Sequence, residues 1–281
     1  MYKGFKMAVC DIDGTLITDK GKITAENRKA IYKMQRKGYI FALCTGRNIK
    51  RAVPIAKKLR INVPIVCIDG ILLYDLKSQK PIFAKSMKKS TVESIIDIGK
   101  KHEIFTEVSN GYNYCKILPD DESKSLDFYH RHDIYGRVKN YFAGIRYFKT
   151  YEELKNTDGD IYQVVLATKS KDMSIIKAEI SIINDKNIEI RDNLWGGYMF
   201  INSIGAGKAQ GVKTLCDMYG ISLNETVSFG DDNNDIDMLL LCEKGIAVEN
   251  ANERVKRNAD VIVSSNNNSG VAEGLKMYFD I

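Results

Sequence analysis

The 281-residue chain has little of what marks special classes of protein: four prolines, three histidines and one tryptophan. So few prolines, with 21 glycines, exclude a collagen-like or proline-rich architecture. No stretch approaches about 18 uninterrupted apolar residues, so we expect no membrane-spanning helix. The apolar run Met7–Cys10 is too short for a signal-peptide core and ends at Asp11. The remaining composition, 44% hydrophobic and 28% charged, is that of an ordinary globular protein.

The six cysteines lack the close spacing of a zinc or redox site, because the nearest pair, Cys44 and Cys67, is 23 residues apart. Cys10, Cys44 and Cys67 lie in apolar runs, where a free cysteine behaves as a small hydrophobe. We therefore expect buried, reduced thiols, which favours a cytoplasmic location.

The net charge of +6 is unevenly distributed along the chain. Residues 1–84 carry 17 basic and 6 acidic side chains, residues 85–195 carry 18 of each, and residues 196–281 carry 7 and 12. A basic segment is compatible with nucleic-acid binding. However, the basic residues between Lys29 and Arg60 are spread along predicted helices without an aromatic stacking series. We interpret them as solvated helix faces whose positive field attracts anionic small molecules, and expect no nucleic-acid or membrane partner.

Strands and helices alternate over the first 70 residues. Apolar, β-branched stretches predict strands at Phe5–Ile12, Tyr39–Cys44 and Pro64–Ile68. A helix from Thr24 to Gly38 and a second one, kinked or shortened by Pro54, separate them. This alternation predicts a parallel sheet covered by helices.

The pattern then changes to hairpins mixed with helices. Asn110-Gly111 is a strong turn signal between two predicted strands, and a second hairpin is predicted over residues 71–84. Parallel strands return after Gly197, at residues 227–229, 245–248 and 261–263. We therefore predict an α/β protein with a Rossmann-like core, residues 1–84 and 194–281, and an inserted α+β domain, residues 85–193.

Polar side chains with related chemistry follow the strands of the predicted core. Ligands of open parallel sheets bind beyond the carboxyl ends of the strands, so these side chains should meet at one edge. They are Asp11 and Asp13, Thr45, the group Asp231, Asn234 and Asp235, and Lys208 at the start of a helix.

Such a set of acids, a hydroxyl and an ammonium suits phosphoryl transfer. Clustered carboxylates repel one another unless a cation neutralises them, and their oxygens suit Mg²⁺. The hydroxyl and the lysine could hold phosphate oxygens, and one carboxylate could attack phosphorus to give an aspartyl-phosphate. Asp13, two residues beyond Asp11, is placed to act as the general acid and base.

Simpler motif assignments fail. Gly207-Lys208 resembles part of a P-loop, but Asn202 replaces the first glycine and Ala209 replaces the Ser or Thr. His102, His130 and His132 lie in the predicted insertion without metal-site spacing, and we interpret them as surface or interior residues.

The ordered set of motifs resembles the haloacid dehalogenase-like (HAD) hydrolase superfamily, specifically its Cof-type branch, subclass IIB. The matching motifs are, in order, Asp11-Ile12-Asp13-Gly14-Thr15-Leu16, Thr45-Gly46-Arg47, Lys208 within residues 207–212, and residues 230–239, GDDNNDIDML. Asn250-Ala251 and Gly270-Val271 also fall where the branch has these pairs. The resemblance therefore covers the chain from end to end.

The resemblance implies a role for each matching position. Asp11 would be the nucleophile and a Mg²⁺ ligand, Asp13 the general acid/base with its backbone carbonyl on the metal, and Asp231 the further metal ligand. Thr45, the Gly46 amide, Lys208 and Asn234 would bind the phosphoryl group, and Asp235 would support the metal's water shell. The insertion would be a C2-type cap that selects the substrate.

Two positions depart from the branch. Asp69-Gly70-Ile71 stands where Asn-Gly-Ala is usual, and Glu249 precedes Asn250 where glycine is usual. Asp69 is either a turn residue, which we favour, or an acid that alters substrate contacts.

We therefore predict a Mg²⁺-dependent phosphatase that hydrolyses small phosphomonoesters, such as sugar phosphates, through a phospho-Asp11 intermediate. A phosphomutase on the same core and a non-enzymatic phospho-acceptor switch are the alternatives. The switch needs neither an acid/base at Asp13 nor a covering domain. The expected partner is a small phosphorylated metabolite, and the sequence specifies no oligomeric state.

Overall fold

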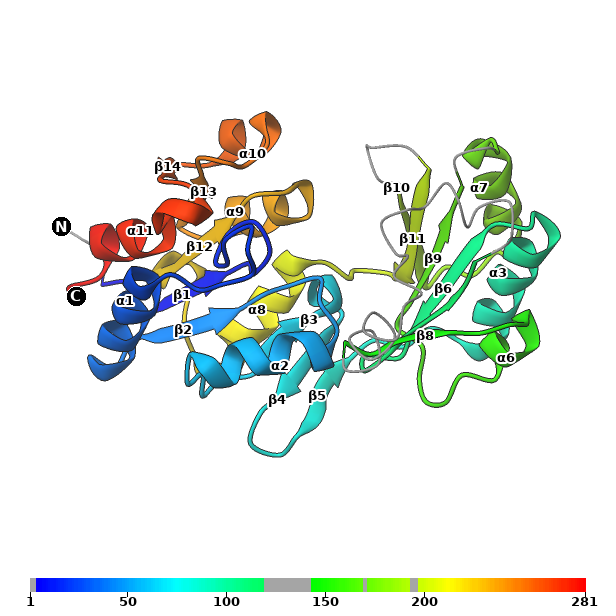
Figure 1. Cartoon of the computed structure of the whole chain (residues 1–281), viewed down its shortest axis with the longest axis horizontal. Coiled ribbons are helices and arrows are strands. Elements are labelled where there is room, and N and C mark those ends of the chain that lie inside the picture. Colours follow the sequence, from blue (N-terminus) through cyan, green and yellow to red (C-terminus); the bar gives the residue numbers. More distant parts are fainter. Residues whose placement is uncertain (1–3, 119–142, 169–170, 193–196) are drawn as a thin grey trace. The chain divides into compact units, whose positions relative to one another are not determined.

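The computed structural model describes residues 4–118, 143–168, 171–192 and 197–281 (Figure 1). The chain divides into two compact units. The first, here called the core unit, comprises Met1–Arg47, Ala52–Phe83 and Ala206–Ile281. The second, here called the inserted unit, comprises Asn48–Arg51 and Ala84–Gly205.

The core unit contains a five-stranded sheet in the order β14-β13-β12-β1-β2. All neighbouring strands are parallel, which confirms the predicted α/β class. The four residues of β1, which lies between β12 and β2, are all buried. The strands are β1 (Met7–Cys10), β2 (Ile40–Leu43), β12 (Thr226–Gly230), β13 (Lys244–Val248) and β14 (Val261–Val263).

Helices connect these strands. In α1 the Thr24 hydroxyl accepts a hydrogen bond from the Asn27 amide, and Ile31 and Met34 are buried, as predicted. Pro54 lies inside α2. Helix α1 packs against α11, and α8 packs against α9 (Figure 1). The helices are α1 (Ala25–Arg36), α2 (Ile49–Lys58), α8 (Lys208–Tyr219), α9 (Ile236–Leu241), α10 (Glu253–Asn258) and α11 (Gly270–Tyr278).

The third predicted strand does not simply extend the parallel sheet. Strand β3 (Ile65–Cys67) meets the end of β2 through a single parallel bridge between Cys44 and Val66. It pairs instead in the antiparallel direction with β4 (Leu72–Asp75), which neighbours β5 (Lys80–Ala84). The predicted hairpin is therefore present, but it recruits the preceding strand into its own three-stranded sheet.

The inserted unit contains a six-stranded sheet in the order β10-β11-β9-β6-β7-β8. Only β7 and β8 pair in parallel; the other neighbours are antiparallel. Helices α3, α6 and α7 supply apolar residues to one buried cluster with this sheet. The elements are α3 (Lys89–Lys101), β6 (Phe105–Ser109), β7 (Tyr114–Ile117), β8 (Ile145–Tyr147), α6 (Tyr151–Lys155), β9 (Gln163–Ala167), α7 (Met173–Ile182), β10 (Ile188–Asp192) and β11 (Tyr198–Ser203).

The second domain boundary differs from the predicted residue 194. Strand β11 pairs with both β9 and β10, so it belongs to the inserted sheet, and the units divide between Gly205 and Ala206. The sequence does not predict a strand at Tyr198–Ser203, and hydrophobic periodicity in any case does not say which sheet a strand joins. Asn110-Gly111 connects β6 to β7, as predicted.

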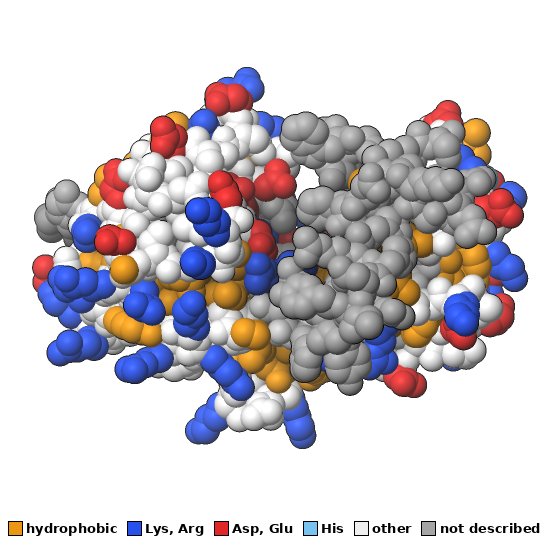
Figure 2. Space-filling view, in the orientation of Figure 1, with side chains coloured by type: hydrophobic (Ala, Val, Ile, Leu, Met, Phe, Trp, Pro, Cys, Tyr) orange, Lys and Arg blue, Asp and Glu red, His pale blue; other side chains and the backbone are white. Residues whose placement is uncertain are grey.

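All six cysteines are buried and free, in agreement with the sequence. His102 lies beside Glu179 at 3.1 Å, while His130 and His132 fall outside the described residues. The basic residues of α1 and α2 are exposed, as expected of solvated helix faces, except Lys50, which is half-buried and donates a hydrogen bond to Asn113. Lysine and arginine side chains are scattered over the surface of the core unit (Figure 2). Within the described ranges, no helix combines the length and apolar character needed to cross a membrane.

Candidate active site

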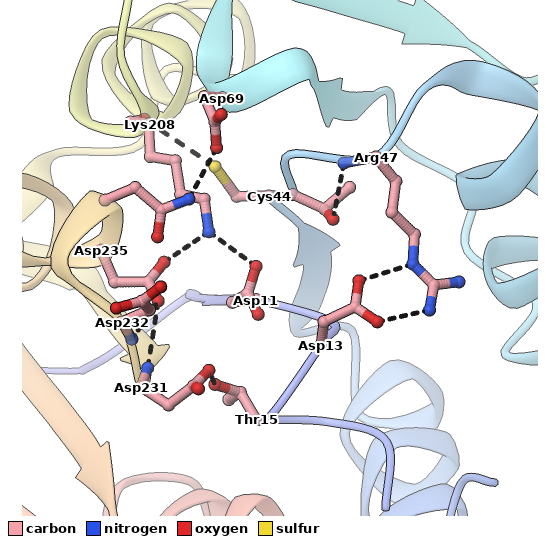
Figure 3. Close-up of polar contacts among 12 residues, drawn as sticks. Asp11, Asp13, Thr15, Cys44, Arg47, Asp69, Lys208, Asp231, Asp232 and Asp235 are labelled. Carbon is pink, nitrogen blue, oxygen red and sulfur yellow. Dashed lines mark hydrogen bonds and ion pairs between the residues drawn. The ribbon is translucent and has the colours of Figure 1, made fainter. Parts of the chain in front are cut away.

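Three loops and one helix start bring the predicted side chains together (Figure 3). Asp11 directly follows β1, Thr45 lies two residues beyond β2, and Asp231 directly follows β12. Because these strands are parallel neighbours, their carboxyl ends share one edge of the sheet. Lys208 is the first residue of α8 and reaches the same edge.

Lys208 joins two of the acids. Its Nζ lies 2.6 Å from Asp11 Oδ1 and 2.6 Å from Asp235 Oδ1. The three side chains are 1%, 6% and 1% exposed, respectively. Such pairs are strong only when the remaining polar atoms are also bonded, because water no longer solvates the charges.

Glycine allows the start of α8 to approach the loop that follows β3. Gly70 has a φ of +89°, and a Cβ there would lie 1.9 Å from the Gly207 carbonyl oxygen. A Cβ at Gly211 would lie 2.4 Å from Val66 Cγ1. The absence of side chains at these two positions therefore allows the close packing that places Lys208 at the sheet edge.

Asp235 organises the loop after β12. Its Oδ2 accepts hydrogen bonds from the backbone amides of Asp231 (3.0 Å) and Asp232 (3.1 Å), while its Oδ1 binds Lys208. Both carboxylate oxygens are thus engaged by the protein. This supports a role in positioning Lys208 and Asp231 rather than direct metal ligation.

The loop after β1 contacts the Asp231 side chain. Thr15 Oγ1 donates a 2.6 Å hydrogen bond to Asp231 Oδ1. A Cβ at Gly14, whose φ is +76°, would lie 2.2 Å from Asp231 Oδ2. Asn250 Nδ2 donates to the Gly14 carbonyl (2.7 Å), so the predicted Asn-Ala pair has a structural explanation.

The electrostatics show an excess of negative charge. Burial and nearby acids raise the pKa of Asp11 well above its usual range, although Lys208 opposes the shift. Burial, reinforced by Asp235, raises the pKa of Asp231 to about 7 despite the Thr15 hydrogen bond. Burial disfavours the Lys208 ammonium, but Asp11 and Asp235 outweigh this and raise the pKa of Lys208. A bound cation would keep the carboxylates ionised.

The donor set fits a hard divalent cation. Asp11, Asp231 and Asp235 each offer an oxygen, and these oxygens all lie within 4.8 Å of one another. An all-oxygen set with few carboxylates suits Mg²⁺. Because Asp235 already binds Lys208 and two amides, Asp11 and Asp231 are the better ligands.

The Asp13 side chain points away from Lys208 and toward Arg47 (Figure 3). Arg47 Nε lies 2.6 Å from Asp13 Oδ2, and Arg47 Nη2 lies 2.6 Å from Asp13 Oδ1. Arg47 belongs to the motif Thr45-Gly46-Arg47, but its sequence position alone assigns it no role. The signal available was the adjacency of an arginine to the Thr45-Gly46 pair, but its partner depends on tertiary structure.

The remaining predicted residues lie around the same edge. Thr45 Oγ1 accepts a hydrogen bond from the Arg47 amide at 3.2 Å. Asn234 Nδ2 donates to Asp69 Oδ1 at 2.8 Å. Asp69 is therefore more than a turn residue, since its side chain contacts Asn234, a residue predicted to bind the phosphoryl group.

Comparison with known proteins agrees with this architecture. The family profile of haloacid dehalogenase-like hydrolases matches residues 8–275. The chain belongs to the haloacid dehalogenase-like hydrolase family. As a member of this family it is a phosphatase, a phosphoric monoester hydrolase.

Curated relatives of this hydrolase cover nearly the whole chain. The 5-amino-6-(5-phospho-D-ribitylamino)uracil phosphatase YitU of Bacillus subtilis is 24% identical over 275 residues, 96% of each chain. The phosphatase YcsE of the same organism, named for the same substrate, is 25% identical over 96% of this chain and 94% of its own.

Solved structures show the same fold. A haloacid dehalogenase-like hydrolase from Bacteroides thetaiotaomicron has a TM-score of 0.80 at 22% identity, over 98% of this chain and all of its own. The subclass IIB sugar phosphatase BT4131 has a TM-score of 0.75 at 21% identity, over 97% of this chain and 98% of its own.

Proposed function

We propose that this hydrolase is a Mg²⁺-dependent phosphatase in which Asp11 takes the phosphoryl group from a small phosphomonoester. The observation that carries the proposal is the buried Asp11 carboxylate, held at 2.6 Å by Lys208 beside Asp231 at the carboxyl edge of the sheet. Lys208 would neutralise both the nucleophile and the incoming phosphate.

The reaction has two steps. The Asp11 carboxylate attacks phosphorus and forms an acyl phosphate, while the ester P–O bond breaks and Asp13 protonates the departing alkoxide. Asp13 then removes a proton from water, whose oxygen attacks phosphorus. Phosphate leaves and the Asp11 carboxylate is restored, so Asp13 serves first as acid and then as base.

The other residues of the edge would bind and orient the phosphoryl group. Thr45, the Gly46 amide and Asn234 would contact its oxygens. Asp11, Asp231 and the Asp13 carbonyl would hold the Mg²⁺, which when bound supplies charge neutralisation and polarises the phosphoryl group. Asp235 would keep Lys208 and Asp231 in place.

The substrate would be a phosphate ester of a sugar or sugar alcohol. The two named phosphatases of Bacillus subtilis act on a phosphoribityl compound, and BT4131 is a sugar phosphatase. A phosphorylated polyhydroxy chain is common to both substrate classes. Turnover of a panel of phosphorylated metabolites with Mg²⁺ tests this assignment.

Asp11→Asn tests the catalytic role of Asp11. We expect the purified variant to lose at least about 10³-fold in kcat for 4-nitrophenyl phosphate, because the amide is not a nucleophile. Rapid quenching with a ³²P-labelled substrate should trap a phosphoenzyme in the wild type and none in the variant. Asp217→Asn, on the exposed face of α8, is the matched control and should keep wild-type activity.

The outcome also separates the alternatives. A native circular-dichroism spectrum with retained turnover in Asp11→Asn contradicts the nucleophile assignment. A phosphomutase would yield isomerised ester in place of inorganic phosphate. Asp13→Ala should abolish turnover, whereas a phospho-acceptor switch would still be phosphorylated and would not need that carboxylate.

A further inference from the structure

The turn that carries Asp69 adopts an uncommon backbone conformation. Ile68 has a φ of +48° and Asp69 a φ of +50°. A β-branched residue rarely adopts positive φ, so this turn is costly and must be held by its surroundings. The Ile68 amide donates to the Arg47 carbonyl and the Asp69 amide to the Thr45 carbonyl, each at 3.1 Å. The turn is thus hydrogen-bonded to the loop predicted to bind phosphate.

The Asp69 side chain faces that loop. Its Oδ1 accepts from Asn234 Nδ2 at 2.8 Å. A Cβ built on Gly46 would lie 3.0 Å from Asp69 Oδ1 and 3.3 Å from Oδ2. Figure 3 shows the carboxylate pointing toward the side chains around Lys208. Two of the proposed phosphate-binding residues, Gly46 and Asn234, therefore lie directly against this half-buried acid.

Among the residues that the structure describes, Asp69 forms no ion pair, so its charge adds to that of the site. Asp11, Asp231 and Asp235 carry three negative charges, which Lys208 and one divalent cation offset. Asp13 and Arg47 neutralise each other. Asp69 is also among the acids that raise the pKa of Lys208. With Asp69 ionised, the pocket that receives a phosphate dianion keeps a net negative charge.

We propose that the Asp69 carboxylate weakens the binding of phosphate dianions in this pocket and thereby aids release of the product phosphate. The inference rests on the proposed phosphatase function and concerns the affinity of its phosphoryl pocket. Like charges a few ångström apart repel, and a half-buried position screens the repulsion only in part.

The same carboxylate also orients Asn234. A carboxylate only accepts hydrogen bonds, so the Nδ2 group of Asn234 must turn toward Asp69. The Oδ1 atom of Asn234 then faces away from Asp69. Asparagine has nearly the same shape as aspartate, tolerates positive φ and retains one accepting oxygen. Asp69→Asn therefore removes the charge while the turn and the contact to Asn234 can remain.

The test measures inorganic phosphate binding by calorimetry in Mg²⁺ buffer, beside inhibition of 4-nitrophenyl phosphate hydrolysis by phosphate. We expect Asp69→Asn to lower both the Kd and the inhibition constant of phosphate roughly tenfold, with the gain shrinking at high ionic strength. Asp217→Asn removes one negative charge on the exposed part of α8 and should change both constants less than about twofold.

A phosphate Kd in folded Asp69→Asn that is unchanged or higher would overturn the inference, as would an equal change in Asp217→Asn. Thermal melting of each variant establishes folding, and Asp69→Ser supplies a second neutral variant should the asparagine variant fail to fold. If the wild type neither binds phosphate nor hydrolyses the ester, the proposed function itself fails. If it does both and Asp69→Asn behaves like wild type, only the role of Asp69 fails.

Discussion

Asp13 is exposed, with 54% of its side chain accessible, and both of its carboxylate oxygens are held by Arg47. The planar guanidinium grips both carboxylate oxygens, and this geometry is specific to arginine. Because Asp13 would transfer protons in both half-reactions, we interpret Arg47 as a positioning residue for the acid/base. A variant that keeps the positive charge but cannot bind both carboxylate oxygens at once should therefore test this role.

Arg47→Lys should lower kcat by roughly ten- to a hundredfold with a smaller effect on KM, because a misdirected acid/base loses part of its contribution of about 10² to 10⁴. The loss should be larger for an alkyl phosphate, whose leaving group needs a proton, than for 4-nitrophenyl phosphate. Steady-state kinetics on the two esters measures this difference. Arg36→Lys, at the exposed end of α1, is the matched control; equal losses on both esters would contradict the role.

Residue types at motif positions could be predicted because phosphoryl chemistry dictates them. Asp11, Lys208 and Asp231 meet at the sheet edge, as the sequence indicated. The partners of Arg47 and Asp69 could not be predicted, since a side chain's direction depends on rotamers and on loops that are distant in sequence. Asp69, interpreted first as a turn residue, is both a turn residue and a partner of Asn234.

Among the elements, helix α8 is positioned by glycine at one end and stopped by glycine at the other. Gly70 lets the helix start approach the loop after β3, whereas Gly220 ends the helix in the left-handed conformation at a φ of +61°. A Cβ at Gly220 would meet no atom within 4 Å. A side chain at Gly220 would therefore meet only conformational strain, whereas a side chain at Gly70 would meet both strain and a steric clash.

Gly70→Ala should destabilise the protein by about 3 kcal/mol, because the new methyl group collides with the Gly207 carbonyl and positive φ disfavours alanine. It should also lower kcat/KM more than tenfold by displacing Lys208. Gly220→Ala should cost only about 1 kcal/mol and leave kcat/KM unchanged. Urea unfolding and steady-state kinetics test both; a catalytically normal Gly70→Ala would refute the proposed link between this packing and Lys208.

Element types were more predictable than their sheet membership. Hydrophobic periodicity located the strands of the parallel sheet, but β3 joined a hairpin, and β11, which was not predicted, joined the inserted sheet. A strand's partner depends on which edges are free once the rest of the chain has folded, and local sequence does not contain that information.

For the molecule as a whole, the acid cluster makes stability depend on both pH and metal. An aspartate in an unfolded chain titrates near 3.9, whereas the pKa of Asp231 in the fold is about 7. Between these values the metal-free folded protein holds a proton that the unfolded chain has released. This group therefore costs stability as the pH rises from about 4 to 7.

Added Mg²⁺ should reverse that loss, because the cation and the proton compete for the same carboxylate. Below pH 7 we expect the Kd of Mg²⁺ to increase by up to about tenfold for each unit of pH lost. Consequently, millimolar Mg²⁺ should raise the Tm more at pH 7.5 than at pH 5.5. Differential scanning calorimetry checks this, with Asp231→Asn expected to lose most of the effect; an equal shift at both pH values would contradict it.

The pairing of β1 with β12 means that two adjacent strands of the sheet are synthesised far apart in time. Met7 of β1 lies opposite Thr226 of β12, so β1 is made long before one of its two neighbours. At about 5–20 residues per second, a ribosome needs roughly 10 to 45 s to reach that neighbour. Until then one apolar strand edge lacks its partner, and such edges promote aggregation. Placing a whole second unit between adjacent strands thus leaves this edge of β1 without its partner until residues 226–230 have been made.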